Sequence, residues 1–468
     1  MTINFTAVPH SSHHHYNVLG IGFGPSNIAL AIAFEEATTD FTAHFIEAAP
    51  DATWQPGMLL SGVDIQNHPM RDLVTPRNPK SHYTFINYLH EVGRLYDFLN
   101  LGIIYALRKD YSKYIQWVAA HFDRLVSYRT RASRVTYDGR HNCWRVVTNN
   151  GVFTGDALIV GTGRTRNVPE QFQQHLGARL FHYCDYAFRM QELVPELSSV
   201  AVIGASQSAV ELHLDLMKRL PDARIYAIHR SFSMRQKDTS PFSDHVYFPD
   251  FIDYFFLAKP EAREEMQRQL RPTNYNSADI DVLHQLYLGI YEERLEGRNR
   301  FHLRNNTIIE SVSPEESGVS LGLRERFFDT TESIRVDAVV LATGFLDIGV
   351  GEGKEPYPSL LAEIAPELAR TEGRGLLVER DYQVRTRVGL PLYLNGLCES
   401  SHGLGDAGSF SLLSLRASEI LRSLEEYFAK HDPAIQSEVA KRTSAVQPEA
   451  VKHTPPVQPE TNYAHHNV

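Results

Sequence analysis

A strand, a glycine loop, a helix and a second strand ending in an acid follow one another near the N-terminus. This order constrains the fold more than any other feature of the chain. The apolar run YNVLGIG (16–22) predicts a buried strand. Gly22 permits a tight turn and Gly24 a close approach of the backbone to a pyrophosphate, while Pro25 opens a helix whose N-terminus favours anions. The next strand, FTAHFIEA, ends in Glu47, an acid that can hold a ribose hydroxyl.

The third glycine place of the GxGxxG pattern holds Asn27, which by that template weakens the packing of the helix on the strand. In its context the segment still predicts a dinucleotide site rather than an ordinary β–α–β turn. A second unit, VAVIGASQSAVELHLDL, carries Gly204, Ser206 and Ala209 in the three places.

The strand that follows the second loop, ARIYAIHRS, ends in His229 and Arg230 instead of an acid, with Arg235 and Lys237 close behind. A cation at this place suits the 2′-phosphate of NADPH, whereas the alternative is a solvated basic loop. The two loops in this order predict a flavoprotein, with an NADPH domain inserted into an FAD domain. Small-residue turns in ALIVGTGRTRNVP and AVVLATGFLDIG let the backbone pass close to a bound dinucleotide.

Composition narrows the class of protein. The 468 residues leave room for two or three domains, and a net charge of −10 argues against a general nucleic-acid binder. The three cysteines form no CxxC pair, which fits a reducing cytoplasm, and no run approaches the ~20 apolar residues of a membrane span. The N-terminus lacks the features of an export signal, so a cytoplasmic protein is expected. The histidines at 13–15 are expected in a solvated tail, and no metal site is predicted.

Three classes of flavoenzyme use two such loops. A disulfide reductase needs a redox CxxC, which is absent. Baeyer–Villiger and sulfur-oxidising enzymes carry FxGxxxHxxx(F/W/Y) between the loops, and EQFQQHLGARLFHYCDYAF does not match it. The N-hydroxylating monooxygenases remain.

Long segments carry a specific resemblance, among them VLGIGFGPSNIALAIA, RNPKSHYTFINYL, VIGASQSAVE, DTSPFSDHVYFPDFIDYFF, TNYNSAD and CESSHGLGD. Together these segments are spread from about Tyr16 to Tyr427, and in them the chain resembles the microbial L-ornithine and L-lysine N-hydroxylases of hydroxamate siderophore biosynthesis. The resemblance implies that NADPH reduces FAD, that oxygen adds to form a C4a-hydroperoxyflavin, and that a neutral primary amine is hydroxylated. It also implies a homo-oligomer, often a tetramer in related proteins, although no segment identifies an interface.

Family positions carry over residue by residue. Gln66 matches a glutamine beside the reacting face of the flavin, Asn274 an asparagine contacting substrate and nicotinamide ribose, and Ser411 a serine near substrate and flavin. These three are the catalytic candidates. The expected cofactor contacts are Gly22, Gly24, Pro25, Asn27, Glu47, Trp54, Gln66, Gly204, Ser206, Gln207, Ser208, Arg230, Thr343, Gly344 and Asp406. For Asp406 a packing or hydrogen-bonding role is favoured over chemistry.

The sequence departs from the family pattern at two residues that are expected to bind the head group of the substrate. Arg71 stands where the ornithine enzymes carry a carboxylate-gripping lysine, and Asp244 stands where they carry an asparagine. Arginine can hold a carboxylate, but a second carboxylate nearby is unfavourable. Either Arg71 and Asp244 satisfy each other, or Asp244 faces a cationic group; both suggest a decarboxylated amine such as putrescine, cadaverine or histamine, whose imidazole Asp244 or His245 could bind. The other reading is that Arg71 still clamps L-ornithine or a similar amino acid.

We therefore expect an α/β fold with two Rossmann-like domains. The FAD domain is predicted at 1–194 and 346–430, the NADPH domain at 195–345 with a small helical substrate region at about 240–300, and a disordered tail at 431–468. An uncoupled NADPH oxidase and a regulator without turnover are the rival functions. The substrate-side motifs TNY and HGLGD argue against both.

Overall fold

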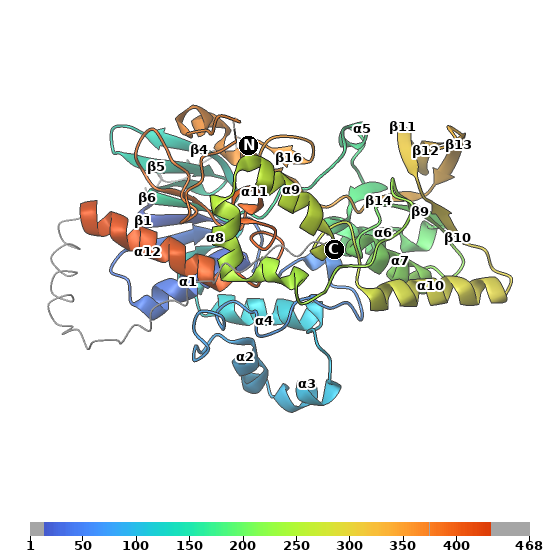
Figure 1. The fold of residues 1–468 in the computed structure, drawn as a ribbon, viewed down its shortest axis with the longest axis horizontal. Coiled ribbons are helices and arrows are strands. Elements are labelled where there is room, and N and C mark those ends of the chain that lie inside the picture. Colours follow the sequence, from blue (N-terminus) through green and yellow to red (C-terminus); the bar gives the residue numbers. More distant parts are fainter. Residues whose placement is uncertain (1–13, 374, 432–468) are drawn as a thin grey trace, which may run out of the picture. The chain divides into compact units, whose positions relative to one another are not determined.

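The computed structural model describes residues 14–373 and 375–431. By its contacts the chain divides into two compact parts, Met1–Ser423 and Leu424–Val468, and the sites described below lie in the first part. Two sheets built mainly of parallel strands confirm the predicted α/β class with two Rossmann-like domains (Figure 1). The tail predicted to be disordered lies outside the described residues, except that His431 ends the last helix.

The first sheet has seven strands in the order β3-β2-β1-β6-β5-β4, with β17 also pairing with β6. They are β1 (His14–Ile21), β2 (Ala43–Ile46), β3 (Val126–Ser127), β4 (Ala132–Asp138), β5 (Cys143–Thr148), β6 (Gly151–Val160) and β17 (Leu392–Leu394). The strands β1, β2, β3, β6 and β17 pair in parallel, whereas β4, β5 and β6 pair antiparallel. The sheet thus joins strands from both ends of the chain.

The histidines at the start of β1 are not in a tail. His14 and His15 pair with the N-terminal half of β6, and Nε2 of His15 lies 3.1 Å from Oδ1 of Asp156. The expectation of a solvated tail was therefore wrong for these two residues, because β6 is long enough to extend the pairing beyond the apolar run.

The second sheet is parallel, in the order β10-β9-β8-β14-β7. Its strands are β7 (Leu180–His182), β8 (Ser199–Ile203), β9 (Arg224–Ile228), β10 (Phe301–Arg304) and β14 (Ala338–Leu341). A three-stranded antiparallel meander follows, formed by β11 (Thr307–Glu315), β12 (Gly318–Glu325) and β13 (Thr331–Val336). Strand β7 joins this sheet from a position before the predicted boundary at 194, and the division of the chain into domains stays a proposal.

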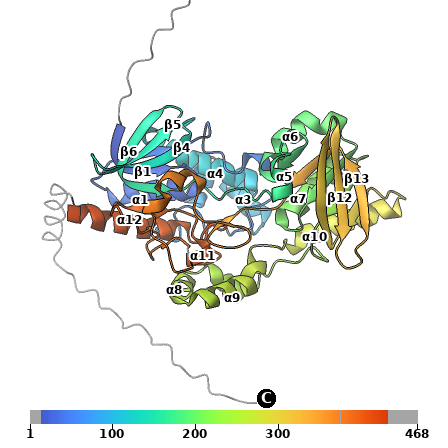
Figure 2. The ribbon, with the colours of Figure 1, turned by 90° about the horizontal axis from the view of Figure 1, so that it is seen from above.

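Alternation along the strands assigns the two faces of the second sheet. Val200 and Val202 pack with helix α7 (Gln207–Arg219) in one buried cluster. Ala201 belongs to another cluster that contains Leu321 and other meander residues. The helix and the meander therefore cover opposite faces, as the period of two requires, and Figure 2 shows the meander strands standing together.

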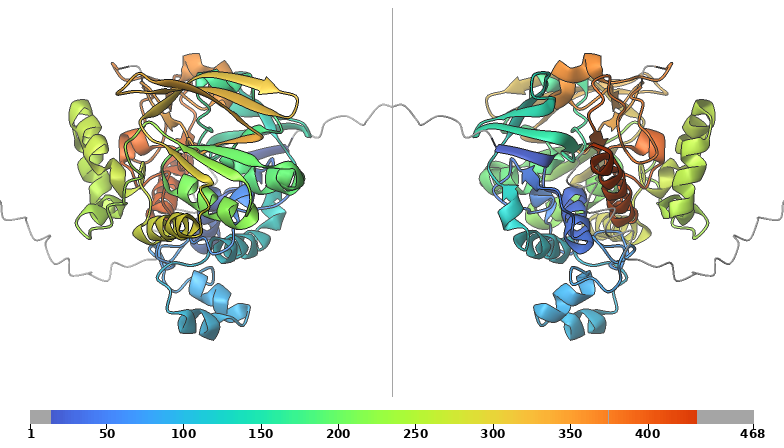
Figure 3. Two further views of the ribbon diagram at one scale, coloured as in Figure 1. Left: turned by 90° about the vertical axis from the view of Figure 1, so that its right-hand side faces the viewer. Right: turned by 90° about the vertical axis from the view of Figure 1, so that its left-hand side faces the viewer.

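The remaining elements connect and cover the sheets. The helices are α1 (Pro25–Ala37), α2 (Phe85–Glu91), α3 (Leu95–Leu101), α4 (Arg108–Ala120), α5 (Glu170–Gln173), α6 (Tyr186–Leu193), α8 (Pro249–Leu257), α9 (Pro260–Leu270), α10 (Ile280–Leu295), α11 (Glu399–His402) and α12 (Leu413–His431). The 3₁₀ helices are η1 (Pro56–Met58), η2 (Asp123–Leu125), η3 (Tyr183–Asp185), η4 (Val194–Glu196), η5 (Ser243–Tyr247), η6 (Arg271–Thr273) and η7 (Ser359–Glu367). The two-residue strands β15 (Asp347–Ile348) and β16 (Lys354–Glu355) pair with each other in parallel. Figure 3 shows α2 and α3 projecting, and the α8–α9 pair on another side.

The region predicted to be helical, about 240–300, is helical from η5 to α10. Proline begins both α8 and α9, where its missing N–H leaves no helical bond unmade. Among the described residues, no helix combines the length and the apolar character that a membrane crossing needs.

Candidate functional site

The first glycine loop has the shape that a dinucleotide needs. Gly22 has a φ of +88°, and a Cβ there would lie 2.5 Å from the carbonyl oxygen of Gly161, so only glycine fits. Gly24 is the N-cap of α1, where no side chain caps the helix and a Cβ would meet nothing within 4 Å. The first-turn N–H groups and the open space above Gly24 fit a pyrophosphate.

Asn27 strengthens the packing that the glycine template expected it to weaken. Its side chain is fully buried, and its Nδ2 donates hydrogen bonds to the carbonyl oxygens of Gly22, at 2.7 Å, and Ile21, at 3.3 Å. A Cβ on Gly161 would lie 2.6 Å from this amide. The space that a third glycine would provide is thus provided by Gly161, directly after the neighbouring strand β6, and the expectation of weak packing was wrong.

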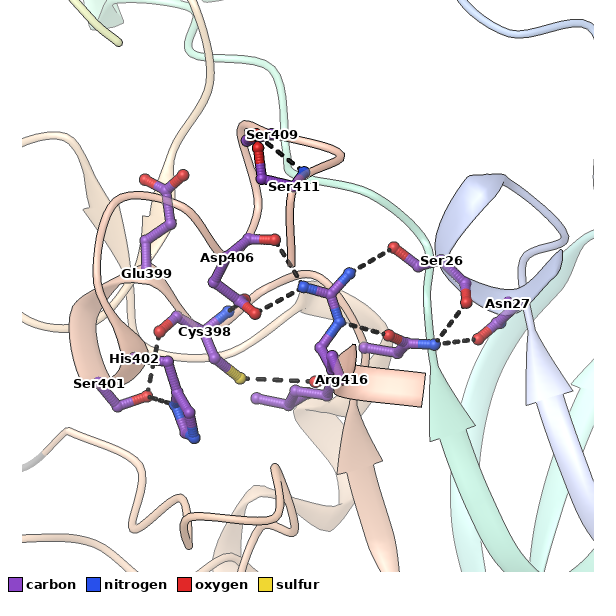
Figure 4. Close-up of polar contacts among 12 residues, drawn as sticks. Ser26, Asn27, Cys398, Glu399, Ser401, His402, Asp406, Ser409, Ser411 and Arg416 are labelled. Atoms are coloured by element: carbon purple, nitrogen blue, oxygen red, sulfur yellow. Dashed lines mark hydrogen bonds and ion pairs between the residues drawn. The ribbon is translucent and has the colours of Figure 1, made fainter. Parts of the chain in front are cut away.

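A buried polar network joins this loop to the C-terminal part of the chain (Figure 4). Nδ2 of Asn395 donates to Oδ1 of Asn27 at 2.9 Å and to the carbonyl oxygen of Ser26 at 3.0 Å. Arg416 donates from Nε to Oδ1 of Asn395 at 2.8 Å and from Nη2 to Oγ of Ser26 at 3.0 Å. The start of α1 is therefore fixed by residues that lie 368 to 390 positions further along the chain.

Asp406 completes this network. Its Oδ1 accepts from Nη1 of Arg416 and its Oδ2 from the backbone N–H of Cys398, both at 2.6 Å. The Arg416 and Asp406 side chains are each 1 % exposed. Because both carboxylate oxygens have protein partners, the geometry supports the hydrogen-bonding role favoured for Asp406, and a direct cofactor contact stays a prediction.

The contacts of two residues beside the loop, Glu47 and Gln66, show whether the site fits a flavin nucleotide. Glu47 accepts from the backbone N–H groups of Phe23, at 2.6 Å, and Ala49, at 2.7 Å, so its carboxylate lies at the glycine turn. Gln66 has a φ of +52°, and its Nε2 is buried without a hydrogen-bond partner in the protein. A buried amide without a protein partner beside the glycine loop can donate to a bound flavin, and the residues present therefore fit FAD.

Trp54 lies in an aromatic cluster rather than in open solvent. Its ring meets Phe410 edge to face with centroids 5.0 Å apart, and Tyr111 at 6.3 Å. Phe410 precedes Ser411, so this cluster connects the predicted flavin side to the predicted substrate side.

Arg71 and Ser411 lie together, as the family positions imply. Nη1 of Arg71 is 3.4 Å from Oγ of Ser411, and Oγ of Ser411 donates to Oδ1 of Asn67 at 3.3 Å. Nδ2 of Asn67 donates in turn to the carbonyl oxygen of Arg71 at 2.8 Å. The Arg71 guanidinium stands over the ring of Tyr247, 5.9 Å from its centroid. Among the described residues no carboxylate lies within ion-pair distance of Arg71.

Asp244 is close to this group without being paired to Arg71. It lies on η5, three residues before Tyr247, and the structure shows no Arg71–Asp244 ion pair. Burial, and next the Asp244 charge, raise the pKa of Tyr247, while Arg71 opposes the shift. The same two charges act in opposite directions on the pKa of Tyr105. The idea that Arg71 and Asp244 satisfy each other was therefore wrong, because the Arg71 guanidinium lies beside Oγ of Ser411 and over the ring of Tyr247 instead. His245 is exposed, and its ring is tilted by 41° against that of Phe248, with the centroids 4.7 Å apart.

Asn274 lies against the closing motif of the chain. Its Nδ2 is 3.5 Å from the carbonyl oxygen of Leu404, and a Cβ on Gly408 would lie 2.5 Å from the same atom. The next residue, Tyr275, accepts from Nη1 of Arg164 at 2.8 Å and donates a short hydrogen bond to Glu399. This contact brings the substrate-side segment against two loops of the first sheet.

Glu399 is the most perturbed acid of this group. Its side chain is 2 % exposed, Arg164 lies 3.6 Å away, and Arg164 also donates to Asp347 at 3.1 Å. Burial raises the pKa of Glu399 to about 8, and Arg164 opposes the shift.

The second loop repeats the first with different chemistry. Gly204 has a φ of +143°, and a Cβ there would lie 2.4 Å from the carbonyl oxygen of Ala342. Ser206 is the N-cap of α7, with no side-chain cap hydrogen bond. Gln207 is engaged by Glu211 and by the backbone N–H of Asp279, both through its amide.

Other predicted contacts of this unit have protein partners or lie open. Ser208 hydrogen-bonds Tyr183, and Oγ1 of Thr343 donates to the carbonyl oxygen of Asn167. A Cβ on Gly344 would meet nothing within 4 Å. Arg230 is 75 % exposed and lies 3.7 Å from Glu352, which is 92 % exposed.

Sequence reasoning did not single out Asn67, Tyr247, Arg164 or Glu399. Asn67 and Tyr247 stand within three residues of predicted site residues, so local proximity could have indicated them. Arg164 follows the GTG turn and Glu399 opens the closing motif, but nothing local shows that they meet. In the described part of the chain, no cluster of three or more His, Cys, Asp or Glu side chains is arranged to hold a metal ion.

Comparison with known proteins gives a consistent result. A family model described as L-lysine 6-monooxygenase/L-ornithine 5-monooxygenase matches residues 14–347. The L-ornithine N(5)-monooxygenase of Pseudomonas aeruginosa is 33% identical over 446 residues, covering 90% of this chain and 98% of the relative. The solved L-lysine 6-monooxygenase of Pseudomonas syringae is 36% identical, with a TM-score of 0.79 over 88% of this chain and 99% of its own. The ornithine N-hydroxylase KtzI of Kutzneria sp. 744, solved with reduced FAD, NADP⁺ and L-ornithine, is 27% identical, with a TM-score of 0.82 over 88% of this chain and 99% of its own.

Proposed function

Because this chain belongs to the family of L-lysine 6-monooxygenases and L-ornithine 5-monooxygenases, we propose that it hydroxylates the side-chain amine of L-ornithine or a similar amino acid. The chain is an FAD- and NADPH-dependent N-monooxygenase, and siderophore biosynthesis is the pathway in which its product serves. Amine, O₂, NADPH and a proton give hydroxylamine, water and NADP⁺. FAD, when bound, supplies the activation of oxygen, and the protein supplies binding, orientation and exclusion of water.

The residues that would hold FAD are those of the first loop. The backbone of Gly22 to Pro25 suits the pyrophosphate and Glu47 the ribose, while the orphan amide of Gln66 suits the flavin. In the second unit, Ser206 begins the helix that would receive NADPH, and Arg230 suits its 2′-phosphate.

The single observation that carries the substrate proposal is the pair of unsatisfied charges around Tyr247. Arg71 has a hydroxyl and an aromatic ring beside it but no carboxylate among the described residues, and Asp244 has no cationic partner there. An amino acid head group offers one carboxylate and one ammonium. Arg71 suits the carboxylate and Asp244 the ammonium, so each charge of the substrate meets its opposite.

The reacting amine needs different surroundings. Its solution pKa is about 10.4, and only the neutral form is nucleophilic, so the distal end of the substrate requires an apolar environment. The aromatic cluster of Trp54, Tyr111 and Phe410 beside Ser411 supports such an environment. Asn274 and Ser411 are the groups proposed to orient the amine.

The test compares substrates with and without the carboxylate. Hydroxylamine product is measured by mass spectrometry, together with peroxide, for L-ornithine, L-lysine, putrescine, cadaverine and histamine. The proposal expects product from an amino acid, with Arg71→Met raising KM for it about tenfold or more and leaving any residual turnover of diamines unchanged. Asp244→Asn should likewise raise KM for the amino acid.

Product from carboxylate-free amines alone would overturn the head-group assignment in favour of a decarboxylated substrate. Peroxide with every amine and product from none would favour the uncoupled oxidase. FAD binding without any NADPH oxidation would favour a regulator.

Further parts of the proposal concern the setting of the enzyme. A cytoplasmic location is supported by Cys143, Cys184 and Cys398, all of which carry free thiols. We also propose a homo-oligomer, to be measured by light scattering of the purified holoenzyme.

A further inference from the structure

One arginine at the meander differs from its neighbours in its partners. Arg304 pairs with Glu332, Arg324 with Glu310 and Asp329, and Arg335 with Glu315. Arg326, at the turn between β12 and β13, has no carboxylate partner among the described residues. Its cationic group is therefore available to an anion that the chain does not supply.

Backbone contacts fix where this turn lies. The N–H of Arg326 donates to the carbonyl oxygen of Asn306 at 2.9 Å, and the N–H of Asn306 donates to the carbonyl oxygen of Ser231, also at 2.9 Å. Nη1 of Arg326 donates to the carbonyl oxygen of Arg230 at 3.1 Å. The turn of the meander thus rests on the turn that follows β9, where the second dinucleotide unit carries its cation.

Two arginines in this position lack a firm counter-charge. Arg230 lies 3.7 Å from Glu352, but both side chains are largely exposed, at 75 % and 92 %. Such a surface pair contributes little to stability and is easily exchanged. A dianionic phosphate, whose second pKa is about 6, is a better partner for two guanidinium groups than one solvated carboxylate.

We propose that Arg326 is a second ligand of the 2′-phosphate of NADPH and that it closes on this group together with Arg230. Arg230 comes from the turn after β9 of the dinucleotide fold, whereas Arg326 comes from the turn of the meander that contacts it. This inference rests on the proposed binding of NADPH by the second unit. It gives the meander turn a role in selecting NADPH over NADH.

The test is equilibrium binding to the FAD-loaded enzyme, with no amine and no turnover. Titration calorimetry compares adenosine 2′,5′-diphosphate with ADP, which lacks the 2′-phosphate. Arg326→Ala should weaken the 2′,5′-diphosphate about tenfold and leave ADP unchanged. Arg335→Ala, an exposed arginine of the same meander, is the matched control and should change neither ligand.

A double variant sharpens the test. If both arginines bind one phosphate, the losses for Arg230→Ala and Arg326→Ala should not add. Unchanged 2′,5′-diphosphate affinity in Arg326→Ala overturns the proposal, and so does an equal loss for both ligands, which would mean that Arg326 only supports the turn.

The binding measurements also separate a failure of this inference from a failure of the proposed amine hydroxylation. If the wild-type enzyme binds both ligands alike, the 2′-phosphate roles of Arg230 and Arg326 fall together, whereas a failure of amine hydroxylation leaves these affinities untouched.

Discussion

The two dinucleotide units meet the same geometric demand with the same device. In the first, a Cβ on Gly22 would collide with the backbone of Gly161; in the second, a Cβ on Gly204 would collide with the backbone of Ala342. In both cases the first glycine lies against the small-residue turn of the adjacent strand. A bulky residue at either glycine would push these two turns apart.

The units differ in how the start of their helix is held. The third place is the buried Asn27 in the first unit and the buried Ala209 in the second. Asn27 is tied through Asn395 to Arg416, while the cation of the second unit, Arg230, lies open to solvent. We call the first unit, whose helix start is held by Asn27, Asn395 and Arg416, the fixed seat, and the second unit, whose cation Arg230 is exposed, the open seat. A fixed seat suits a cofactor that stays bound, and an open seat suits a cofactor that leaves after each turnover.

The largest expected effect comes from removing the fixed seat. Arg416→Met leaves Asp406 buried without its counter-charge, a loss of about 3–5 kcal/mol in the free energy of unfolding. We expect poor expression or a much lowered Tm, with loss of bound FAD. Arg422→Met, an exposed position on the same helix, should leave Tm and FAD content unchanged. A stable, yellow Arg416→Met protein would contradict the idea that the network holds the first unit.

A substitution at Gly24 separates the cofactor from the fold. Because a Cβ there meets nothing within 4 Å, Gly24→Val should fold with nearly native Tm after FAD is removed. Bound FAD would collide with the new side chain, so its Kd should rise at least about a hundredfold, or about 2.7 kcal/mol. Gly177→Val is the matched control, since that glycine is equally open. Full FAD occupancy in Gly24→Val, measured from the absorbance of the purified protein, would remove the loop from the FAD site.

These two variants also mark what the sequence could and could not predict. Both loops, their order and the change from Glu47 to Arg230 were readable, because strand, turn and helix signals are local. The role of Asn27 was not, because the room for its side chain comes from Gly161, a residue 134 positions later. Local patterns contain no information on which distant residue yields space.

The substrate side shows the same limit. Arg71 and Asp244 were recognised as departures from the family pattern, yet an ion pair between them was a wrong interpretation. The Arg71 guanidinium lies over the ring of Tyr247, a residue of η5, and the Arg71 and Asp244 charges act in opposite directions on the pKa of Tyr247. A sequence can indicate that two charges lie in one region without indicating whether they pair with each other.

The open seat should respond to a change in charge without a change in stability. Arg230→Ala should weaken NADPH about tenfold and NADH hardly at all, because only NADPH carries the 2′-phosphate. Tm should not change, since the side chain is largely exposed. Arg224→Ala, an exposed arginine at the start of the same strand, serves as control. An equal loss for both nucleotides would mean that Arg230 does not read the 2′-phosphate.

The smallest effect is a pH dependence of opposite sign in the two regions. Beside the first unit, the pKa of Glu399 is raised to about 8 by burial, so its contribution to stability is present below about pH 4.5 and is lost as pH rises through 8. On α7 of the second unit, burial lowers the pKa of His213 to about 3, so its contribution is present above about pH 6.5 and is lost as pH falls towards 3.

Tm measured from pH 4 to pH 9 separates the two groups. Glu399→Gln keeps a hydrogen-bonding partner for Tyr275 but cannot ionise, so it should flatten the fall in Tm on the alkaline side only. His213→Phe, at a fully buried position where neither ring nitrogen has a partner, should flatten the fall on the acid side only. Each kcal/mol is worth about 2 °C at most in a chain of this length, so the shifts are small but opposite. If either variant reduced the fall in Tm on both the acid and the alkaline side, the stabilities of the two units would depend on pH together. The contrast between a fixed and an open seat would then not extend to their stability.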